Sequence, residues 1–399
     1  MVHHQQESSH EEQRPQHDSP SRHTVITRLF LPIFSAKYKT EVTAHCLLDA
    51  LSSRVIPADI ADDSELQLLH ETSGYLWKPP AINRVFDIRT FFSLYYAPFA
   101  RAAPLLFQKL RSEAVFGIDE AAYQHAFTQP LQPVDSLGFS GSLFFFTADG
   151  TQLVKSIGRK FEYTFLYEKM LEGYAFYVSL HGGDTLLCRI MDVVYTFHHR
   201  IGAWLGVSPS HYIVMKNTLH SLDTDRGCQK WDLKPPGFFE PTRDLVPDSV
   251  KTEAAKSGLA DQLEASDKIL LDRRGKQQLM GLLERDTEFL KDMRTIDYSL
   301  LLGRYPVAMF SDKELLETDF AKGVKSADGK WVYRMCLLDF LWNVDQLRPK
   351  VMKTAGKILP EQTITTEPEM MMDEYIVVPG KEEDEISSDE DYEHVEVQS

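Results

Sequence analysis

The stretch Thr295–Arg304 (TIDYSLLLGR) changes the period of the hydrophobic pattern, and that change indicates the fold. The residues before it recur at three-, four- and seven-residue steps, which is typical of an amphipathic helix. These are Leu279, Leu282, Leu283, Phe289, Leu290 and Met293. Inside the stretch, Ile296, Tyr298, Leu300 and Leu302 alternate with Asp297, Ser299 and Leu301, as in a strand. Asp297 is therefore expected where a buried helix passes into a buried strand.

An aspartate at such a junction is a candidate catalytic group at the edge of a cleft. The alternative is a solvated turn aspartate, which is the common role of a single Asp in this position. Other chemistry-bearing segments of the chain favour the catalytic interpretation, and they are described next.

A Gly-Ser loop and a strand lysine suggest a phosphate site in residues 138–157, GFSGSLFFFTADGTQLVKSI. Leu143–Phe146 and Leu153–Ile157 are predicted strands, joined by an Asp-Gly turn. The preceding loop contains backbone N–H groups that could approach phosphates. Its residues are Gly138, Ser140, Gly141 and Ser142. Lys155 could neutralise phosphate oxygens beneath the loop, or it could be an edge-strand lysine that faces water.

Two segments after the hairpin are expected to complete a nucleotide site. Residues 161–177 have the pattern of a helix, and its acids Glu162 and Glu168 are both candidates to pair with Lys155. Residues 185–198 and 211–216 are predicted strands. The second ends at a predicted hinge between lobes, where Met215 and Asn217 are candidate nucleotide contacts.

A second acidic candidate follows the apolar run Trp331–Leu338, which is a predicted buried strand. The run ends in Asp339, and carboxylates at strand ends that border a cleft are common metal ligands. The alternative is a capping or turn aspartate. After it come Arg348, Lys350, Lys353 and Lys357, a cationic stripe that is either a solvated helix face or a site for anionic head groups.

The charge of the chain is concentrated at its end. Residues 361–399 carry one Lys against fourteen Asp and Glu, so −13 of the net −16 lies there and residues 1–360 are nearly neutral. The four cysteines are far apart and lack zinc-type spacing, which favours a reducing compartment. No apolar run of about 18 residues is present. A cytoplasmic protein, peripheral at membranes, is expected, with no nucleic-acid partner.

Composition also predicts the domain organisation. Residues 1–24 and 361–399 are expected to be disordered tails, and residues 25–90 form an uncertain N-terminal segment. Residues 91–217 are expected to form an N-lobe that holds the hairpin. Residues 218–360 are expected to form a C-lobe with both aspartates and an activation segment.

Several motifs together resemble the phosphatidylinositol phosphate kinases. The resemblance runs collinearly over around two-thirds of the chain, and its most specific part is the pairing of RDTEFLKDM (285–293) with IDYSLLLG (296–303). The other matching segments are residues 96–123, SGSLFFFT, LVKSI, DLK at 232–234 and CLLDFL at 336–341. The resemblance implies an α+β, two-lobed kinase-like core with antiparallel sheets, the fold of SAICAR synthase.

The resemblance also implies roles for individual residues. The loop at 138–142 would cover the phosphates of ATP, Lys155 would contact them, and Glu162 would be its helix partner. Asp297 matches the catalytic aspartate, Asp339 the Mg²⁺-binding aspartate, and Lys234 the lysine of the family's D-L-K-G-S motif. The implied reaction transfers the γ-phosphate of ATP to a hydroxyl of a phosphatidylinositol phosphate at an anionic membrane surface, and a homodimer is left open.

The chain departs from the family's pattern at two places. Pro235 and Pro236 replace the Gly-Ser that follows D-L-K, which removes two backbone donors. The activation segment contains Arg348-Pro349-Lys350 where the family has adjacent lysines, and it is short. Two other functions therefore stay open, a phosphoinositide-binding pseudokinase and a kinase of soluble inositol phosphates.

Overall fold

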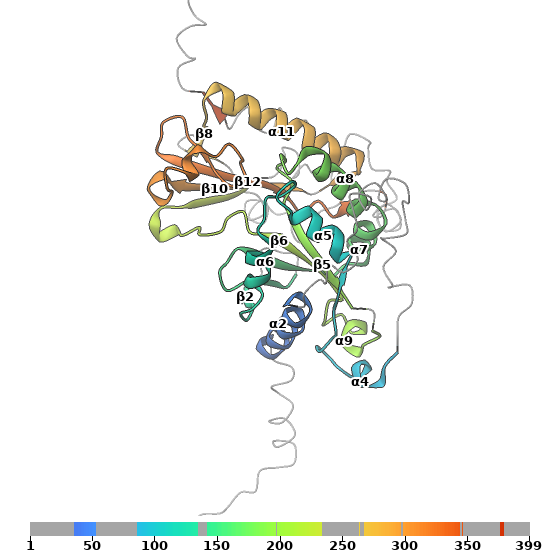
Figure 1. Cartoon of the computed structure of the whole chain (residues 1–399). Coiled ribbons are helices and arrows are strands. Elements are labelled where there is room, and N and C mark those ends of the chain that lie inside the picture. Colours follow the sequence, from blue (N-terminus) through green and yellow to red (C-terminus); the bar gives the residue numbers. More distant parts are fainter. Residues whose placement is uncertain are drawn as a thin grey trace, which may run out of the picture.

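Two antiparallel sheets, lying side by side and flanked by helices, form the centre of the structure, a computed structural model (Figure 1). The described residues are 36–52, 86–134, 142–196, 198–233, 263, 267–296, 298–343, 345 and 376–378. The expected α+β fold class is confirmed. The predicted tails at 1–24 and 361–399 lie outside this set, apart from residues 376–378.

The first sheet has six strands in the order β1-β5-β6-β4-β3-β2. Their bounds are β1 Ala100–Ala102, β2 Gln132–Val134, β3 Phe144–Phe146, β4 Gln152–Ile157, β5 Ile190–Tyr195 and β6 His211–Lys216. The hairpin predicted for β3 and β4 is confirmed, and its turn contains Gly150 at φ +69°, a conformation that glycine adopts without strain. The strand predicted at 185–198 is shorter than expected. Residues 185–189 form a linker between α8 (Leu171–His181) and β5, and this linker is hydrogen-bonded to β12 (Trp331–Leu338) of the second sheet.

The second sheet has four strands in the order β11-β12-β10-β7. Their bounds are β7 Gln229–Leu233, β10 Ser299–Pro306, β11 Val324–Lys325 and β12 Trp331–Leu338. Two smaller pairings lie beside it, β9 (Thr295–Ile296) with β13 (Trp342–Asn343), and β8 (Ile269–Leu270) with β14 (Ile376–Val377). The change of period predicted at 295–304 is confirmed, since the long helix before it passes into β9 and β10.

The helices of the first sheet surround it in Figure 1. Their bounds are α2 Ala36–Ser52, α4 Ile88–Phe91, α5 Pro104–Arg111, α6 Glu120–Ala126, α7 Lys160–Phe165, α8 Leu171–His181 and α9 Ile201–Trp204. A π-helical turn at Leu166–Met170 joins α7 to α8, where the sequence predicts one continuous helix. None of the helices among the described ranges combines the length and the hydropathy that a bilayer-crossing helix needs.

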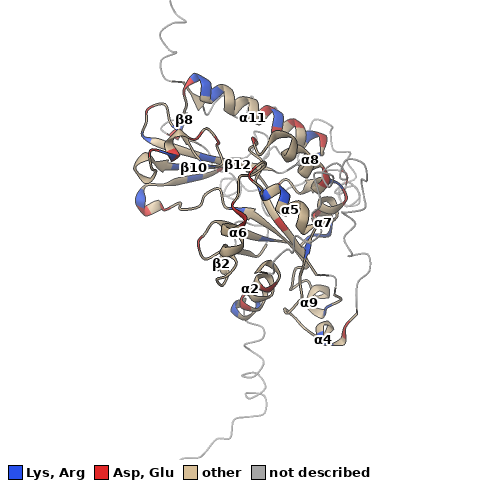
Figure 2. Ribbon diagram, in the orientation of Figure 1, with Lys and Arg blue, Asp and Glu red and all other residues tan. Residues whose placement is uncertain are grey.

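The long helix α11 (Arg273–Asp292) covers the second sheet (Figure 1). Asp272 caps its N-terminus by accepting a hydrogen bond from Gly275 N at 2.6 Å. Its buried leucines are those that the periodicity predicts, and they join one core cluster with Leu300 and Leu302 of β10. The charged residues of α11 are basic at its start and mixed in sign toward its end (Figure 2).

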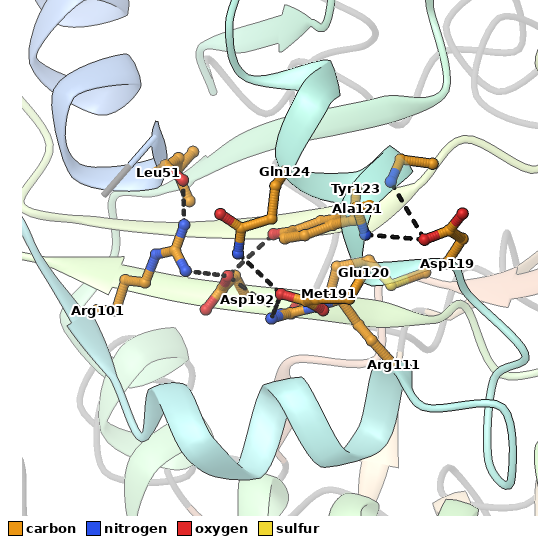
Figure 3. Close-up of polar contacts among 11 residues, drawn as sticks. Leu51, Arg101, Arg111, Asp119, Glu120, Ala121, Tyr123, Gln124, Met191 and Asp192 are labelled. Carbon is orange, nitrogen blue, oxygen red and sulfur yellow. Dashed lines mark hydrogen bonds and ion pairs between the residues drawn. The ribbon is translucent and has the colours of Figure 1, made fainter. Parts of the chain in front are cut away.

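A buried ionic network joins α2, α5, α6 and two strands of the first sheet (Figure 3). Arg111, fully buried, donates to both carboxylate oxygens of Glu120 at 2.7 and 2.9 Å and to Asp192 at 3.2 Å. Tyr123 donates to the same Asp192 oxygen at 2.9 Å. Arg101 contacts Asp192 at 3.7 Å and also donates to the Leu51 carbonyl at the end of α2. The network therefore fixes α2, which precedes the predicted N-lobe, against β5.

A second buried carboxylate, Asp286 of α11, joins that helix to the rest of the core. It accepts from Tyr177 Oη of α8, from Thr185 Oγ1 at 3.0 Å and from Leu186 N at 2.5 Å. Burial raises the pKa of Asp286 to about 6, although these three donors act to lower it.

Replacing Arg111 with Met should lower the free energy of unfolding by about 3–5 kcal/mol, because Asp192 and Glu120 would each lose a cationic partner and Asp192 would remain buried. The control is Lys330→Met, which removes an exposed pair to Asp328 and should cost up to about 1 kcal/mol. Urea unfolding of both variants measures the difference. Equal losses would contradict the role assigned to the buried network.

The raised pKa of Asp286 predicts a pH-dependent contribution to stability. Because the folded protein favours the protonated form, this contribution is full below about pH 4 and is lost as pH rises through about 6. The difference in unfolding free energy between wild type and Asp286→Asn should therefore change by about 3 kcal/mol across this range. Urea titrations at successive pH values test this, and Asp292→Asn, at the exposed end of α11, should show no such change.

Candidate active site

The candidate site lies where β4 of the first sheet meets the end of β12. Lys155 occupies the middle of β4, with Phe144 of β3 and Ile213 of β6 as its backbone neighbours. Its ammonium group forms an ion pair with the Asp339 carboxylate, which immediately follows β12. The Lys155 side chain is 18% exposed and that of Asp339 is 42% exposed. Two residues that are 184 positions apart thus meet between the two sheets.

The local electrostatics make this pair interdependent. Burial acts to lower the pKa of Lys155, but the Asp339 carboxylate outweighs it, with Glu162 adding to the effect, and the net pKa is raised. Asp339 has φ +65°, a conformation that residues other than glycine adopt rarely. Such backbone conformations are found disproportionately at functional sites.

Glu162 lies near Lys155, although its hydrogen bonds go elsewhere. Its carboxylate accepts from Trp342 Nε1 at 3.0 Å and from the backbone N–H of Arg159 at 3.2 Å. The Arg159 guanidinium lies over the Trp342 ring at 4.7 Å. The expected Lys155–Glu162 partnership is thus replaced by a Lys155–Asp339 pair, and Glu162 instead fixes the segment that follows Asp339.

The strands on either side of Asp297 pair with the strands on either side of Asp339. Asp297 itself lies outside the described residues. β9 pairs with β13, Ile296 opposite Trp342, and β10 pairs with β12, Ser299 opposite Leu338. The strands that flank position 297 in the chain are therefore bonded to those that flank Asp339.

The remaining predicted site residues fall into three groups. Ser142 lies half-buried two residues before β3, and Met215 is buried on β6 with its sulfur 3.7 Å from Cys188 Sγ. Asn217 uses its side chain for structure, because its amide donates to the Gly150 carbonyl at 2.8 Å. Outside the described residues lie the predicted Gly138, Ser140, Gly141, Lys234, Arg348, Lys350, Lys353 and Lys357.

The structure adds Asp232, which the sequence-based site omits although it belongs to the DLK motif. Asp232 lies opposite Leu301 of β10, and the other neighbour of Leu301 is Cys336 of β12. Burial raises the pKa of Cys336 to about 11, with Asp339 and Asp232 adding to the rise. Sequence reasoning missed Asp232 because the DLK motif alone does not show which face of the sheet it occupies. The pairing of β7 with β10 supplies that information.

Oxygen ligands are available for a hard cation, although within the described ranges no three His, Cys, Asp or Glu side chains gather into a metal site. Mg²⁺ is commonly held by one or two carboxylates together with substrate phosphates. Asp339, partly exposed and already facing a cation, has the donor type and the access that such binding requires.

The ion pair predicts a specific pKa change. In Asp339→Asn, burial is no longer outweighed, so the pKa of Lys155 should fall below its ordinary value. Glu162→Gln is the matched comparison and should produce a smaller fall, because Glu162 contributes less to the raised pKa. NMR titration of the ¹³C-dimethylated Lys155 amine measures both. An unchanged pKa in Asp339→Asn would show that the two groups do not interact.

Comparison with known proteins shows which family part of this chain is similar to. Residues 126–315 match the sequence profile described as Phosphatidylinositol-4-phosphate 5-Kinase. Phosphatidylinositol 5-phosphate 4-kinase type-2 gamma of Xenopus tropicalis is 28% identical over 226 residues, 56% of this chain and 50% of that protein. Phosphatidylinositol 4-phosphate 5-kinase 1 of Arabidopsis thaliana is 31% identical over 202 residues, 50% of this chain and 24% of that protein.

The human phosphatidylinositol 5-phosphate 4-kinase type-2 alpha is similar to a comparable extent, 29% identical over 220 residues, 54% of this chain and 50% of that protein. The chain thus spans about half the length, or less, of these curated relatives. The matched profile includes Lys155 and position 297 and ends before Asp339. The resemblance expected from the motifs is confirmed: residues 126–315 of this chain are similar in sequence to the phosphatidylinositol phosphate kinases.

Proposed function

We propose that this protein is an ATP-dependent lipid kinase that phosphorylates a ring hydroxyl of a phosphatidylinositol phosphate. The observation that supports the proposal is the Lys155–Asp339 ion pair, because it joins a cation that could bind phosphate to a carboxylate that could bind a metal. The relatives are named as kinases of phosphatidylinositol phosphates, which supports the same substrate class here.

The chemistry of phosphoryl transfer agrees with these residues. The reaction needs positioning and charge stabilisation more than covalent assistance. When ATP binds, Lys155 would release Asp339 and contact phosphate oxygens. Asp339 would then hold Mg²⁺, which neutralises charge developing on the phosphates. Asp297 would orient the attacking hydroxyl and accept its proton.

The proposal includes a membrane surface as the place of reaction. The substrate is part of a bilayer, so the enzyme would act as a cytoplasmic, peripheral protein. The cationic residues Arg348, Lys350, Lys353 and Lys357 would contact anionic head groups there, and each could add about 1 kcal/mol of attraction near an anionic leaflet.

Phosphate transfer to lipid vesicles tests the activity. Wild type should transfer labelled phosphate from ATP to vesicles that contain phosphatidylinositol 4-phosphate or 5-phosphate. Lys155→Met, Asp297→Asn and Asp339→Asn should each lower transfer by at least about 100-fold, because each removes a charge acting on the transition state. Lys330→Met, an exposed lysine outside the site, is the control and should retain activity.

The same assay separates the rival functions. Pro235 and Pro236 motivate the pseudokinase alternative, and that alternative predicts thermal stabilisation by Mg²⁺ and ATP with no labelled product. A kinase of soluble inositol phosphates would phosphorylate the free head group and would not sediment with anionic vesicles. Incorporation that is equal in wild type and Asp297→Asn would discard the lipid-kinase assignment.

A further inference from the structure

Asp286 belongs to the RDTEFLKDM motif, yet the proposed reaction gives it no role. Its carboxylate is fully buried on α11 and accepts three hydrogen bonds. One donor, Tyr177, belongs to α8. The other two, Thr185 Oγ1 and Leu186 N, belong to the linker that runs from α8 to β5.

The opposite side of this linker is bonded to β12. Leu337 N donates to the Leu186 carbonyl at 2.6 Å, and Cys188 N donates to the Leu337 carbonyl at 2.8 Å. Thr185 extends the connection, because its Oγ1 also accepts from Leu187 N at 3.1 Å. Leu187 and Leu337 thus form a short parallel bridge, and Asp286 holds the linker side of this bridge through Thr185 and Leu186.

The bridge lies two residues before Asp339. The backbone of Asp339 is in the left-handed region, and such a conformation persists only where neighbouring structure holds it. After Asp339, Phe340 is buried with its ring 6.2 Å from that of Tyr174. Before Asp339, the two hydrogen bonds of Leu337 to the linker fix the backbone.

We propose that Asp286 is a positioning residue for Asp339: by fixing linker residues 185–188 against β12, it places the Asp339 carboxylate opposite Lys155 for metal binding. The metal-binding part rests on the proposed function. The three hydrogen bonds of Asp286 go to α8 and the linker, so its effect on Asp339 would pass through the linker.

The charge of Asp286 matters to this role because all three of its partners donate. A protonated carboxyl must carry a hydrogen on one of the oxygens that now accept these bonds. The charged and titratable groups that interact with it are Tyr177 and Tyr174 on α8 and Arg285 on α11, and Arg285 in turn interacts with His181 and Asp184. Of these, Tyr177, through its hydrogen bond, and Arg285 favour the ionised form.

Two single-group deletions separate positioning from general stability. Thr185→Val removes the hydroxyl that connects Asp286 to Leu187 N, whereas Tyr177→Phe removes a hydrogen bond to Asp286 that does not involve the linker. Both residues are buried, so similar losses of Tm are expected. Asp286→Asn tests the carboxylate itself, and Asp292→Asn is the matched exposed control on the same helix.

The first measurement is hydrogen exchange of the full chain without ligand. Thr185→Val and Asp286→Asn should speed exchange of the Cys188 and Leu337 amides, and Tyr177→Phe and Asp292→Asn should leave it unchanged after correction for global stability. The second is Mn²⁺ affinity with a non-hydrolysable ATP analogue. Thr185→Val and Asp286→Asn should weaken Mn²⁺ about tenfold, as loss of a group that orients a metal ligand typically does. The two controls should stay within about twofold.

A pH profile adds a readout that loss of stability alone would not change. The ratio of the Mn²⁺ affinities of wild type and Asp286→Asn should fall as pH drops through about 6, where Asp286 protonates, because the titration of the nucleotide phosphates is common to both and cancels. The ratio of Asp292→Asn to Asp286→Asn should show the same fall.

The outcomes distinguish this inference from the proposed function. Faster amide exchange in Thr185→Val without any metal–nucleotide binding by wild type would keep the Asp286–linker coupling and reject the kinase. Normal phosphate transfer and unchanged exchange in Thr185→Val and Asp286→Asn would keep the kinase and reject the positioning role. Equal effects of Thr185→Val and Tyr177→Phe on Mn²⁺ affinity would also reject it.

Discussion

The two sheets of this protein depend on a short backbone connection between the linker 186–188 and Leu337. Two hydrogen bonds join the linker to β12, and the linker continues directly into β5 of the other sheet. Because backbone hydrogen bonds fix both distance and direction, this connection sets how the end of β12 approaches β4. The meeting of Asp339 with Lys155 follows from it.

Buried charge is stabilised in three different ways around this connection. Asp192 has cationic partners, Arg111 and Arg101, in a network that holds the outer helices. Asp286 accepts hydrogen bonds from neutral donors only, and burial raises its pKa although these donors act to lower it. Lys155 and Asp339 have each other and remain partly exposed. The partly exposed pair can exchange its partner for a ligand at lower cost than a fully buried one, which agrees with the functional role proposed for it.

The comparisons and the geometry cover different parts of the site. The matched profile includes Lys155 and Glu162 but ends before β12. Asp339 is connected to the matched region by strand pairing, since β12 pairs with β10 and β13 pairs with β9. The structure therefore places a residue beyond the matched profile beside strands that the profile includes.

Local pattern in the sequence determined most of the elements. The periodicity of 279–293 and the alternation after it gave a helix and strands, and the Asp-Gly turn gave the β3–β4 hairpin, because these depend on neighbouring residues only. The strand predicted at 185–198 began too early, because an apolar run does not reveal that Leu186–Cys188 bonds to Leu337 instead of continuing β5.

The site shows the same division. Residue type and motif singled out Lys155, Asp297 and Asp339 from the sequence, since phosphoryl transfer requires cations and carboxylates. Sequence reasoning paired Lys155 with Glu162, whereas the structure pairs it with Asp339 and leaves Glu162 as a weaker electrostatic neighbour; Asp232 and Asp286 were not selected. Partners that lie more than a hundred residues apart are chosen by how sheets and helices pack, and spacing along the chain does not record that packing. The sequence thus determined which groups are present, and only the tertiary structure decided which of them meet.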